Sequence, residues 1–215
     1  MRRCSLQNLV ELKAATQLEP EDELVNKAQT GCAESFAVLV KEYELRIYRL
    51  SYAVTGDPEV AEVILLETFL KAYANIGDFR GQSRFYTWLV HIAINEGVTK
   101  LRRRDGPNGV SLEQPADADG PISVAGDIDD WRDNPEESYG KNELRAILSK
   151  TLQDLETPLR VVFVLRDIAD LSSEDAAKVL GLSVPTLTRR LMRGRLKLRD
   201  KLSVWFEEHP ALAAG

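Results

Sequence analysis

Cysteine, histidine and long apolar runs are all scarce in this chain of 215 residues. The two cysteines, Cys4 and Cys32, lack the spacing of a metal site or a redox pair, so we interpret them as free thiols in a reducing cytosol. Cys32 in particular is expected to be a small packing residue of a helix. The two histidines, His91 and His209, lie far apart, and no nucleophile, metal or phosphate-loop spacing accompanies them. The sequence therefore gives little support to an enzyme and predicts no catalytic residue, no metal and no cofactor.

No apolar run approaches the ~20 residues that a membrane-spanning helix needs, and the N-terminus has no apolar core typical of a signal peptide. The sequence thus predicts no membrane insertion and a cytoplasmic location. Alternating strand patterns of useful length are also missing, so the expected fold class is all-α. Residues 161–165 are β-prone, but they lie within a longer helical period and we interpret them as a buried helix.

Positive charge is in the minority, with 28 Lys and Arg against 34 Asp and Glu and a formal net charge of −6. A protein that coats nucleic acid unaided is usually basic overall, so any DNA binding here should be local or assisted by a partner. The cations are nevertheless concentrated, above all at 184–199, where Pro185 stands in a first helical turn and five arginines follow it. A short helical pattern at 173–180 and a turn containing Gly181 precede this segment. Helix, glycine turn and basic helix form the layout of a helix-turn-helix.

Composition divides the chain into three zones. Residues 105–137 hold four prolines, four glycines and many acids, a mixture that cannot bury a core and that predicts a flexible, acidic linker. Helical periods on either side predict two small helical domains, at 20–104 and 138–208. In the first domain we expect helices at 21–30, 33–54, 58–75 and 84–103, with a break at Gly56, Asp57 and Pro58.

The expected helix at 84–103 combines aromatic residues with a basic end, Lys100 and Arg102 to Arg104. Cations at a helix C-terminus complement the helix dipole, and this alone would account for them. Aromatic side chains beside cations also suit stacking on unpaired bases while the cations neutralise phosphates. Composition leaves both interpretations open, and Trp88 could equally be a core residue.

Three segments resemble a known family. Residues 78–95, with Phe-Arg-Gly, an aromatic pair, Thr-Trp-Leu, Ile-Ala and Asn, resemble region two of the extracytoplasmic-function (ECF, group 4) sigma factors of the sigma-70 family of bacterial RNA polymerase. Residues 67–73 resemble the helix with which that family binds the polymerase core. Residues 155–199, with Val-Phe-Val-Leu-Arg-Asp and Arg-Gly-Arg, resemble region four and its helix-turn-helix. The blocks occur in the family's order and separation, and only the linker and both ends lie outside them.

The resemblance implies a sigma factor that binds core RNA polymerase and directs promoter-specific initiation in response to envelope or environmental stress. The first domain would bind polymerase and open the minus-ten element, and the second would read the minus-thirty-five element as duplex. Promoter DNA, core polymerase and an anti-sigma factor, often membrane-bound, are the implied partners. A stand-alone helix-turn-helix regulator is the alternative; it would dimerise and bind DNA tightly without polymerase. The acidic total and the separate aromatic and basic helix favour the sigma factor.

The same resemblance, together with side-chain chemistry, indicates the site residues. Contacts to the minus-ten strand are expected from Lys71, Phe79, Arg80, Gly81, Gln82, Ser83, Tyr86, Trp88 and Asn95, the last because an amide can read a base edge. Phosphate contacts are expected from Lys100, Arg102, Arg103, Arg104, Thr186 and Arg190. Contacts to the minus-thirty-five element are expected from Thr188, Arg189, Met192 and Arg193. Polymerase contacts are expected from Val63, Leu66, Glu67 and Leu70.

Two departures from the family pattern concern these sites. Val63 and Leu66 stand where the family usually has polar groups in its core-binding helix. Either the polymerase contact is more apolar here or core binding is weaker. Ile94 stands where the family often has a cation, which affects the details of minus-ten affinity and leaves the expected fold unchanged.

Overall fold

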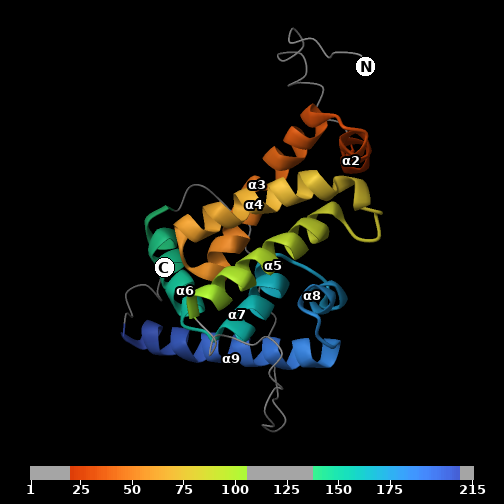
Figure 1. Cartoon of the computed structure of the whole chain (residues 1–215). Helices are drawn as coiled ribbons and strands as arrows, with labels where there is room; N and C mark the ends of the chain where they lie inside the picture. Colours follow the sequence, from red (N-terminus) through yellow and green to blue (C-terminus); the bar gives the residue numbers. More distant parts are fainter. Residues whose placement is uncertain (1–19, 106–137, 209–215) are drawn as a thin grey trace.

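A computed structural model describes residues 20–105 and 138–208 of the chain (Figure 1). Within these ranges the regular elements are helical and no strand occurs, which confirms the expected all-α class. The N-terminal bundle contains α2 (Glu21–Gln29), α3 (Ala33–Thr55), α4 (Pro58–Asn75), the 3₁₀ turn η3 (Ile76–Asp78) and α5 (Phe85–Asp105). The C-terminal bundle contains α6 (Ser138–Gln153), α7 (Thr157–Phe163), the π-helical segment η4 (Val164–Ile168), α8 (Ser173–Leu180) and α9 (Val184–Glu208). The predicted flexible linker, apart from Asp105 at the end of α5, lies outside the described residues.

Local chemistry sets the break between α3 and α4 where the sequence predicts it. α3 ends at Gly56, whose φ of 71° lies in the left-handed region that glycine adopts without a steric penalty. The Asp57 carboxylate then caps α4 by accepting hydrogen bonds from the backbone N–H of Glu59 (3.0 Å) and of Val60 (3.2 Å). Pro58 occupies the first turn, where its missing N–H would have had no helical partner.

Similar capping interactions set the ends of the first helix of the helix-turn-helix. The hydroxyl of Ser172 caps α8 by accepting a hydrogen bond from the backbone N–H of Asp175 (3.0 Å). Gly181 ends α8 with a φ of 65°. α9 then runs past α8, α7 and α6, and Leu187 anchors its first turns in the core of the bundle. Figure 1 shows α9 along one side of the C-terminal bundle.

The β-prone segment at 161–165 is helical and buried, as expected from its longer period. It spans the end of α7 and the start of η4, and Val161, Val162 and Leu165 are fully enclosed. A second packing expectation needs correction. Cys32 does not pack within a helix but lies half-buried at the N-cap of α3, where its thiol donates to Glu34 and accepts from Ser35.

α4 carries apolar residues on two faces. One face, which includes Ile64 and Phe69, packs into the core against α3 and α5. The other face is a stripe at helical spacing that stays in solvent: Val63 is 46 % exposed, Leu66 62 %, Leu70 61 % and Tyr73 49 %. We call these four residues the α4 stripe. Because large apolar side chains at such spacing normally face a core, the stripe indicates a surface that a partner covers.

The two bundles pack against each other, an arrangement that the sequence does not predict. α6, α7 and η4 contact α3, and α8 contacts α5. The side-chain amide of Gln153, at the end of α6, donates to the backbone carbonyl of Ala53 (3.0 Å) and to that of Tyr52 (3.4 Å) near the end of α3. The buried Arg160 guanidinium in turn donates to Oε1 of Gln153 (2.8 Å). A Cβ at Gly56 would lie 2.5 Å from the same oxygen, so a larger residue there would displace the Gln153 side chain.

Candidate nucleic-acid interface

An aromatic cluster fixes the loop between η3 and α5. The Phe79 ring lies 5.3 Å from Trp88 and 5.6 Å from Phe85, centroid to centroid, and Phe85 is fully buried. From α2, the Gln29 amide donates to the carbonyls of Ile76 (3.0 Å) and Phe79 (2.7 Å) and ties the loop to the bundle. Phe79 and Trp88 are therefore half-buried supports of the loop, with part of each ring still accessible.

Beyond this cluster the loop projects into solvent. Arg80, Gly81 and Gln82 are exposed and Ser83 is half-buried, so the polar part of the predicted minus-ten contact set is accessible. Gly81 has a φ of 65°, a left-handed conformation in which other residues are strained. The loop is thus anchored by its aromatic residues and exposes a polar tip. This arrangement is suitable for holding an unstacked nucleobase.

Tyr86 has a different environment from the rest of the predicted minus-ten set. Its ring is only 9 % exposed, stacks on Tyr43 at 5.7 Å and lies under the Arg46 guanidinium at 3.7 Å. Desolvation by burial raises the pKa of its hydroxyl, an effect that the nearby Arg46 charge opposes. Tyr86 is enclosed in this arrangement of the bundles, so its expected contact to the minus-ten strand stays a prediction that requires its ring to become accessible.

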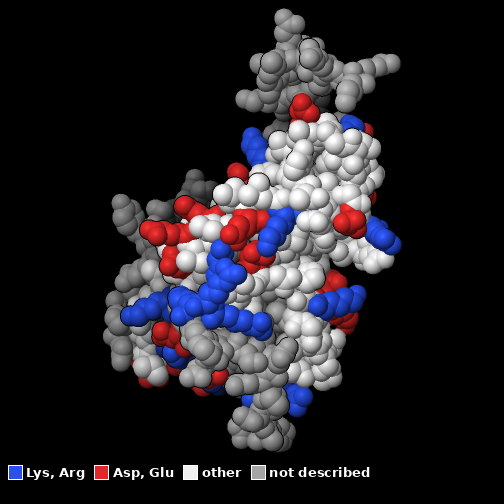
Figure 2. Space-filling view, in the orientation of Figure 1, with Lys and Arg blue, Asp and Glu red and all other residues white. Residues whose placement is uncertain are grey.

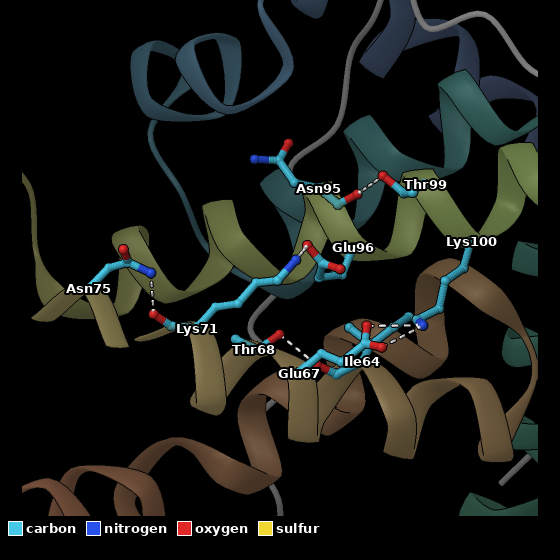
Figure 3. Close-up of polar contacts among 9 residues, drawn as sticks. All are labelled: Ile64, Glu67, Thr68, Lys71, Asn75, Asn95, Glu96, Thr99 and Lys100. Carbon is cyan, nitrogen blue, oxygen red and sulfur yellow. Dashed lines mark hydrogen bonds and ion pairs between the residues drawn. The ribbon is translucent and has the colours of Figure 1, made fainter. Parts of the chain in front are cut away.

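α5 and α4 place cations and an amide on one accessible surface (Figure 3). Asn95 is exposed, and its side-chain amide points away from the ion pairs below it, while its backbone carbonyl accepts from the Thr99 hydroxyl (2.7 Å). Lys71 of α4 pairs with Glu96 of α5, and Lys100 of α5 pairs with Glu67 of α4 at 2.9 Å. Sequence reasoning missed Glu96, since only the packing of α4 on α5 brings it to Lys71.

The charge of Glu67 is stabilised by the neighbouring ion pairs of α4 and α5. The hydrogen bond from Lys100 is the main reason why the pKa of Glu67 lies below its ordinary value. Partial burial opposes this shift, and the nearby charge of Lys71 adds to it. The four side chains therefore behave as one connected group across two helices.

A shallow cavity of about 290 Å³ lies between the bundles on the same side of α5. Asn95, Val98 and Arg102 line it from α5, and Val179 and Leu180 line it from α8. Farther along α5, Arg103 and Arg104 are exposed. Figure 2 shows basic side chains gathered where α5 ends, with acidic side chains beside them. The predicted minus-ten surface thus directly adjoins the first helix of the helix-turn-helix.

α9 presents part of its predicted contact set. Thr188 and Arg189 are exposed on its first turns, and Met192 and Arg193 are half-buried one turn later. Arg190, however, is only 4 % exposed, and desolvation by burial lowers the pKa of its guanidinium. Arg190 is enclosed in the structure without DNA, so its expected phosphate contact stays a prediction that requires the guanidinium to become accessible.

The first turn of α9 and the later cations of this helix make contacts within the protein. The Thr186 hydroxyl is half-buried and hydrogen-bonded to the hydroxyl of Ser183 at 2.9 Å. Farther along α9, Lys197 pairs with Glu156 and Lys201 pairs with Asp154 at 3.1 Å. These pairs divide α9 into a leading part that faces solvent and a trailing part that is attached near the end of α6 and the start of α7.

Comparison with known proteins identifies the family. The family model of sigma-70 region 2 matches residues 39–106, and the family model of sigma-70 region 4 matches residues 145–198. The RNA polymerase sigma-H factor of Pseudomonas aeruginosa is 34% identical over 180 residues, which cover 82% of this chain and 91% of that protein. The chain belongs to the ECF sigma factors of the sigma-70 family. The ECF RNA polymerase sigma-E factor of Haemophilus influenzae is 32% identical over 181 residues, 83% of this chain and 93% of the relative.

Solved structures share the fold of this sigma factor. CnrH, in complex with the cytosolic domain of CnrY, is 24% identical, with a TM-score of 0.61 over 86% of this chain and 99% of CnrH. The sigma factor RpoE of Bartonella quintana, in complex with the anti-sigma factor NepR, is 23% identical, with a TM-score of 0.54 over 76% of this chain and 96% of RpoE. At these identities the likeness concerns the fold. In the part of the chain that the structure describes, no helix is long and apolar enough to cross a membrane.

Proposed function

We propose that this sigma factor binds core RNA polymerase through the α4 stripe and directs initiation at promoters that its two bundles read together. The observation that carries the proposal is the pair of family matches, in the order region 2 and region 4, around an exposed apolar stripe. Of the predicted polymerase contacts, Val63, Leu66 and Leu70 are exposed and Glu67 is half-buried beside them. This supports the more apolar of the two contacts that the sequence allows, since burying such side chains favours association.

The minus-ten element is held by the loop at 79–83 and by α5. The loop tip receives an unstacked base, Trp88 and Phe79 support it, and Asn95 reads a base edge. Lys71, Lys100 and the arginines at 102–104 neutralise the backbone of the opened strand. Unstacking costs a few kcal/mol per base, which contacts from both the loop and the cations offset.

The minus-thirty-five element is read as duplex by the leading turns of α9. Thr188 and Arg189 are accessible there, and Met192 and Arg193 follow on the next turn. Arginine pairs bidentately with guanine in the major groove, which gives about 1–3 kcal/mol of discrimination per base pair. α8 lies across the backbone, as the first helix of a helix-turn-helix does.

Promoter reading requires the two bundles to separate. Elements centred at positions ten and thirty-five lie about 25 base pairs apart, or about 85 Å at about 3.4 Å per base pair. In the structure α5 and α8 are in contact and line one cavity. The contact between bundles, including the Gln153 hydrogen bonds, therefore belongs to the protein before it binds a promoter.

An anti-sigma factor that covers the polymerase-binding stripe, release under envelope or environmental stress, and a cytoplasmic location complete the proposal. The stripe supports the first point, because an apolar surface needed for polymerase is available to a competing partner. A location with the polymerase follows from the proposed activity. The protein acts as an initiation factor with no catalytic step of its own.

In-vitro transcription with purified core polymerase tests the function. The expected result is specific initiation only when the protein and core enzyme are both present, with weak promoter binding by the protein alone. The paired variants Leu66→Asp and Leu45→Asp provide the control, since both side chains are exposed but only Leu66 lies on the stripe. Leu66→Asp is expected to abolish initiation and Leu45→Asp to retain it. Absence of core binding, with tight binding of a dimer to palindromic DNA, would contradict the proposal.

A further inference from the structure

The two lysines assigned to DNA are held by acids across the α4–α5 contact. Lys71 reaches from α4 to Glu96 on α5, and Lys100 reaches from α5 to Glu67 on α4 (Figure 3). The side chain of Glu96 is only 17% exposed and that of Glu67 36%, so both carboxylates sit at the base of the surface rather than in open solvent. Each lysine is thus placed close to the protein by a partly buried anion.

These acids weaken the surface as a phosphate site. A carboxylate in contact with an ammonium cancels most of the attraction that the cation would exert on an approaching phosphate. Each neutralised phosphate also releases condensed counterions, and a lysine that stays with a carboxylate contributes no such release. The free protein therefore has two fewer effective phosphate contacts than its lysines would provide.

Glu67 lies at the edge of the polymerase-binding stripe. It directly follows Leu66 and precedes Leu70 by three residues, so it shares a helix face with the stripe. A partner that covers Leu66 and Leu70 also covers Glu67, and a cationic side chain of that partner would compete with Lys100 for its carboxylate. The positive charge of Lys71 also acts on Glu67, which extends this competition to Lys71.

We propose that Glu67 and Glu96 hold Lys100 and Lys71 away from DNA in the free protein, and that polymerase binding at the α4 stripe releases them. The inference rests on the proposed function and adds to it a route by which core binding raises affinity for the minus-ten strand. Glu96 acts as a positioning residue, since it acts through Lys71. By linkage, loss of a lysine from the network raises affinity for polymerase, just as polymerase raises affinity for DNA.

The first experiment measures binding of the free, full-length protein to a labelled oligo(dT) strand over a series of salt concentrations. Glu96→Gln is expected to steepen the dependence of log affinity on log salt by about 0.7, the value for one more phosphate contact on a single strand. At about 0.1 M salt this corresponds to about fivefold tighter binding. Glu62→Gln is the matched control, because it removes the same charge from an exposed position of α4 and should leave the slope unchanged. Adding Lys71→Ala to Glu96→Gln should restore the original slope.

Equal slopes for Glu96→Gln and Glu62→Gln would overturn the proposal. A second experiment measures affinity of the labelled protein for core polymerase without DNA. Lys100→Ala, which frees Glu67, is expected to bind core about threefold or more tightly than Lys41→Ala, in which an exposed lysine of α3 is removed. Identical affinities would also contradict the coupling. If no variant binds core at all, the proposed function fails, whereas the oligo(dT) slopes still report whether the acids hold the lysines.

Discussion

The two surfaces proposed to read DNA are built in different ways. The minus-thirty-five surface is the leading face of one helix, α9, and neighbouring turns of that helix supply its residues. The minus-ten surface is composite: it takes a loop tip, one face of α5 and Lys71 from α4, which meet only after the helices pack. A local surface tolerates changes elsewhere in the chain, whereas a composite one depends on the core beneath it.

The largest expected effect is a loss of stability when the core beneath the composite surface is disrupted. Ile64 is fully buried under α4, and Ile64→Ala is expected to reduce the free energy of unfolding by about 2–5 kcal/mol through lost burial and a cavity. Leu66→Ala, two positions along the same helix, should leave stability almost unchanged because Leu66 is mostly exposed. Urea unfolding monitored by circular dichroism measures both. Equal destabilisation by the two variants would place Leu66 in the core and remove the stripe.

A smaller effect is expected at the surface of α9, in the recognition of one base pair. Arg193→Ala is expected to weaken recognition at one base pair of the minus-thirty-five element by about 1–3 kcal/mol, because a bidentate contact to guanine is lost. Transcription from promoters randomised in that element, with core polymerase present, checks this. The minus-ten preference should stay the same. If every sequence is weakened equally, Arg193 contacts phosphate instead of a base.

The contact between bundles gives the next effect. Gln153→Ala removes the hydrogen bonds to the carbonyls of Tyr52 and Ala53, each with a net contribution of about 0.5–1.5 kcal/mol. The expected result is a larger population of separated bundles, seen as a greater mean distance between dyes on α2 and α9. Gln29→Ala is the matched control, since it removes an amide that acts within the N-terminal bundle. No difference between the two variants would show that Gln153 does not hold the bundles together.

The smallest effect is a pH response of the ion-pair network. The pKa of Glu67 is lowered in the folded protein, so its contribution to stability is present above the unfolded value near 4.5 and is lost as pH falls through the folded value. In Lys100→Ala the titration midpoint of Glu67 should rise, because the main cause of the shift is gone. Carboxyl-carbon NMR titration of the two proteins measures this. An unchanged midpoint would mean that Lys100 does not pair with Glu67 in solution.

Much of the fold could be predicted because its signals are local. Helix ends at Gly56, Asp57 and Gly181 follow from backbone conformation and capping, which act within a few residues. The β-prone stretch at 161–165 was correctly predicted as helix because its apolar period continues beyond it. These properties need no knowledge of the rest of the chain.

The candidate site was less predictable, because accessibility depends on packing. Tyr86 and Arg190 were expected to meet DNA, yet one is enclosed by Tyr43 and Arg46 and the other lies in the C-terminal bundle. Conversely, Glu96 had no local signal and became visible only through its contact with Lys71. Side-chain type and spacing indicate what a residue can do, but burial decides whether it can do it.

The amino-acid sequence by itself determined the helical class, the helix-turn-helix and the family, since each depends on periodicity, capping or a contiguous motif. Tertiary structure decided which residues face solvent, which lysines are held by acids and how the bundles meet. The physical reason is that burial and ion pairing join residues far apart in the chain, such as Glu67 with Lys100 and Gln153 with Ala53. The spacing of two residues in the sequence does not give their distance in space, because that distance is set by how the helices pack.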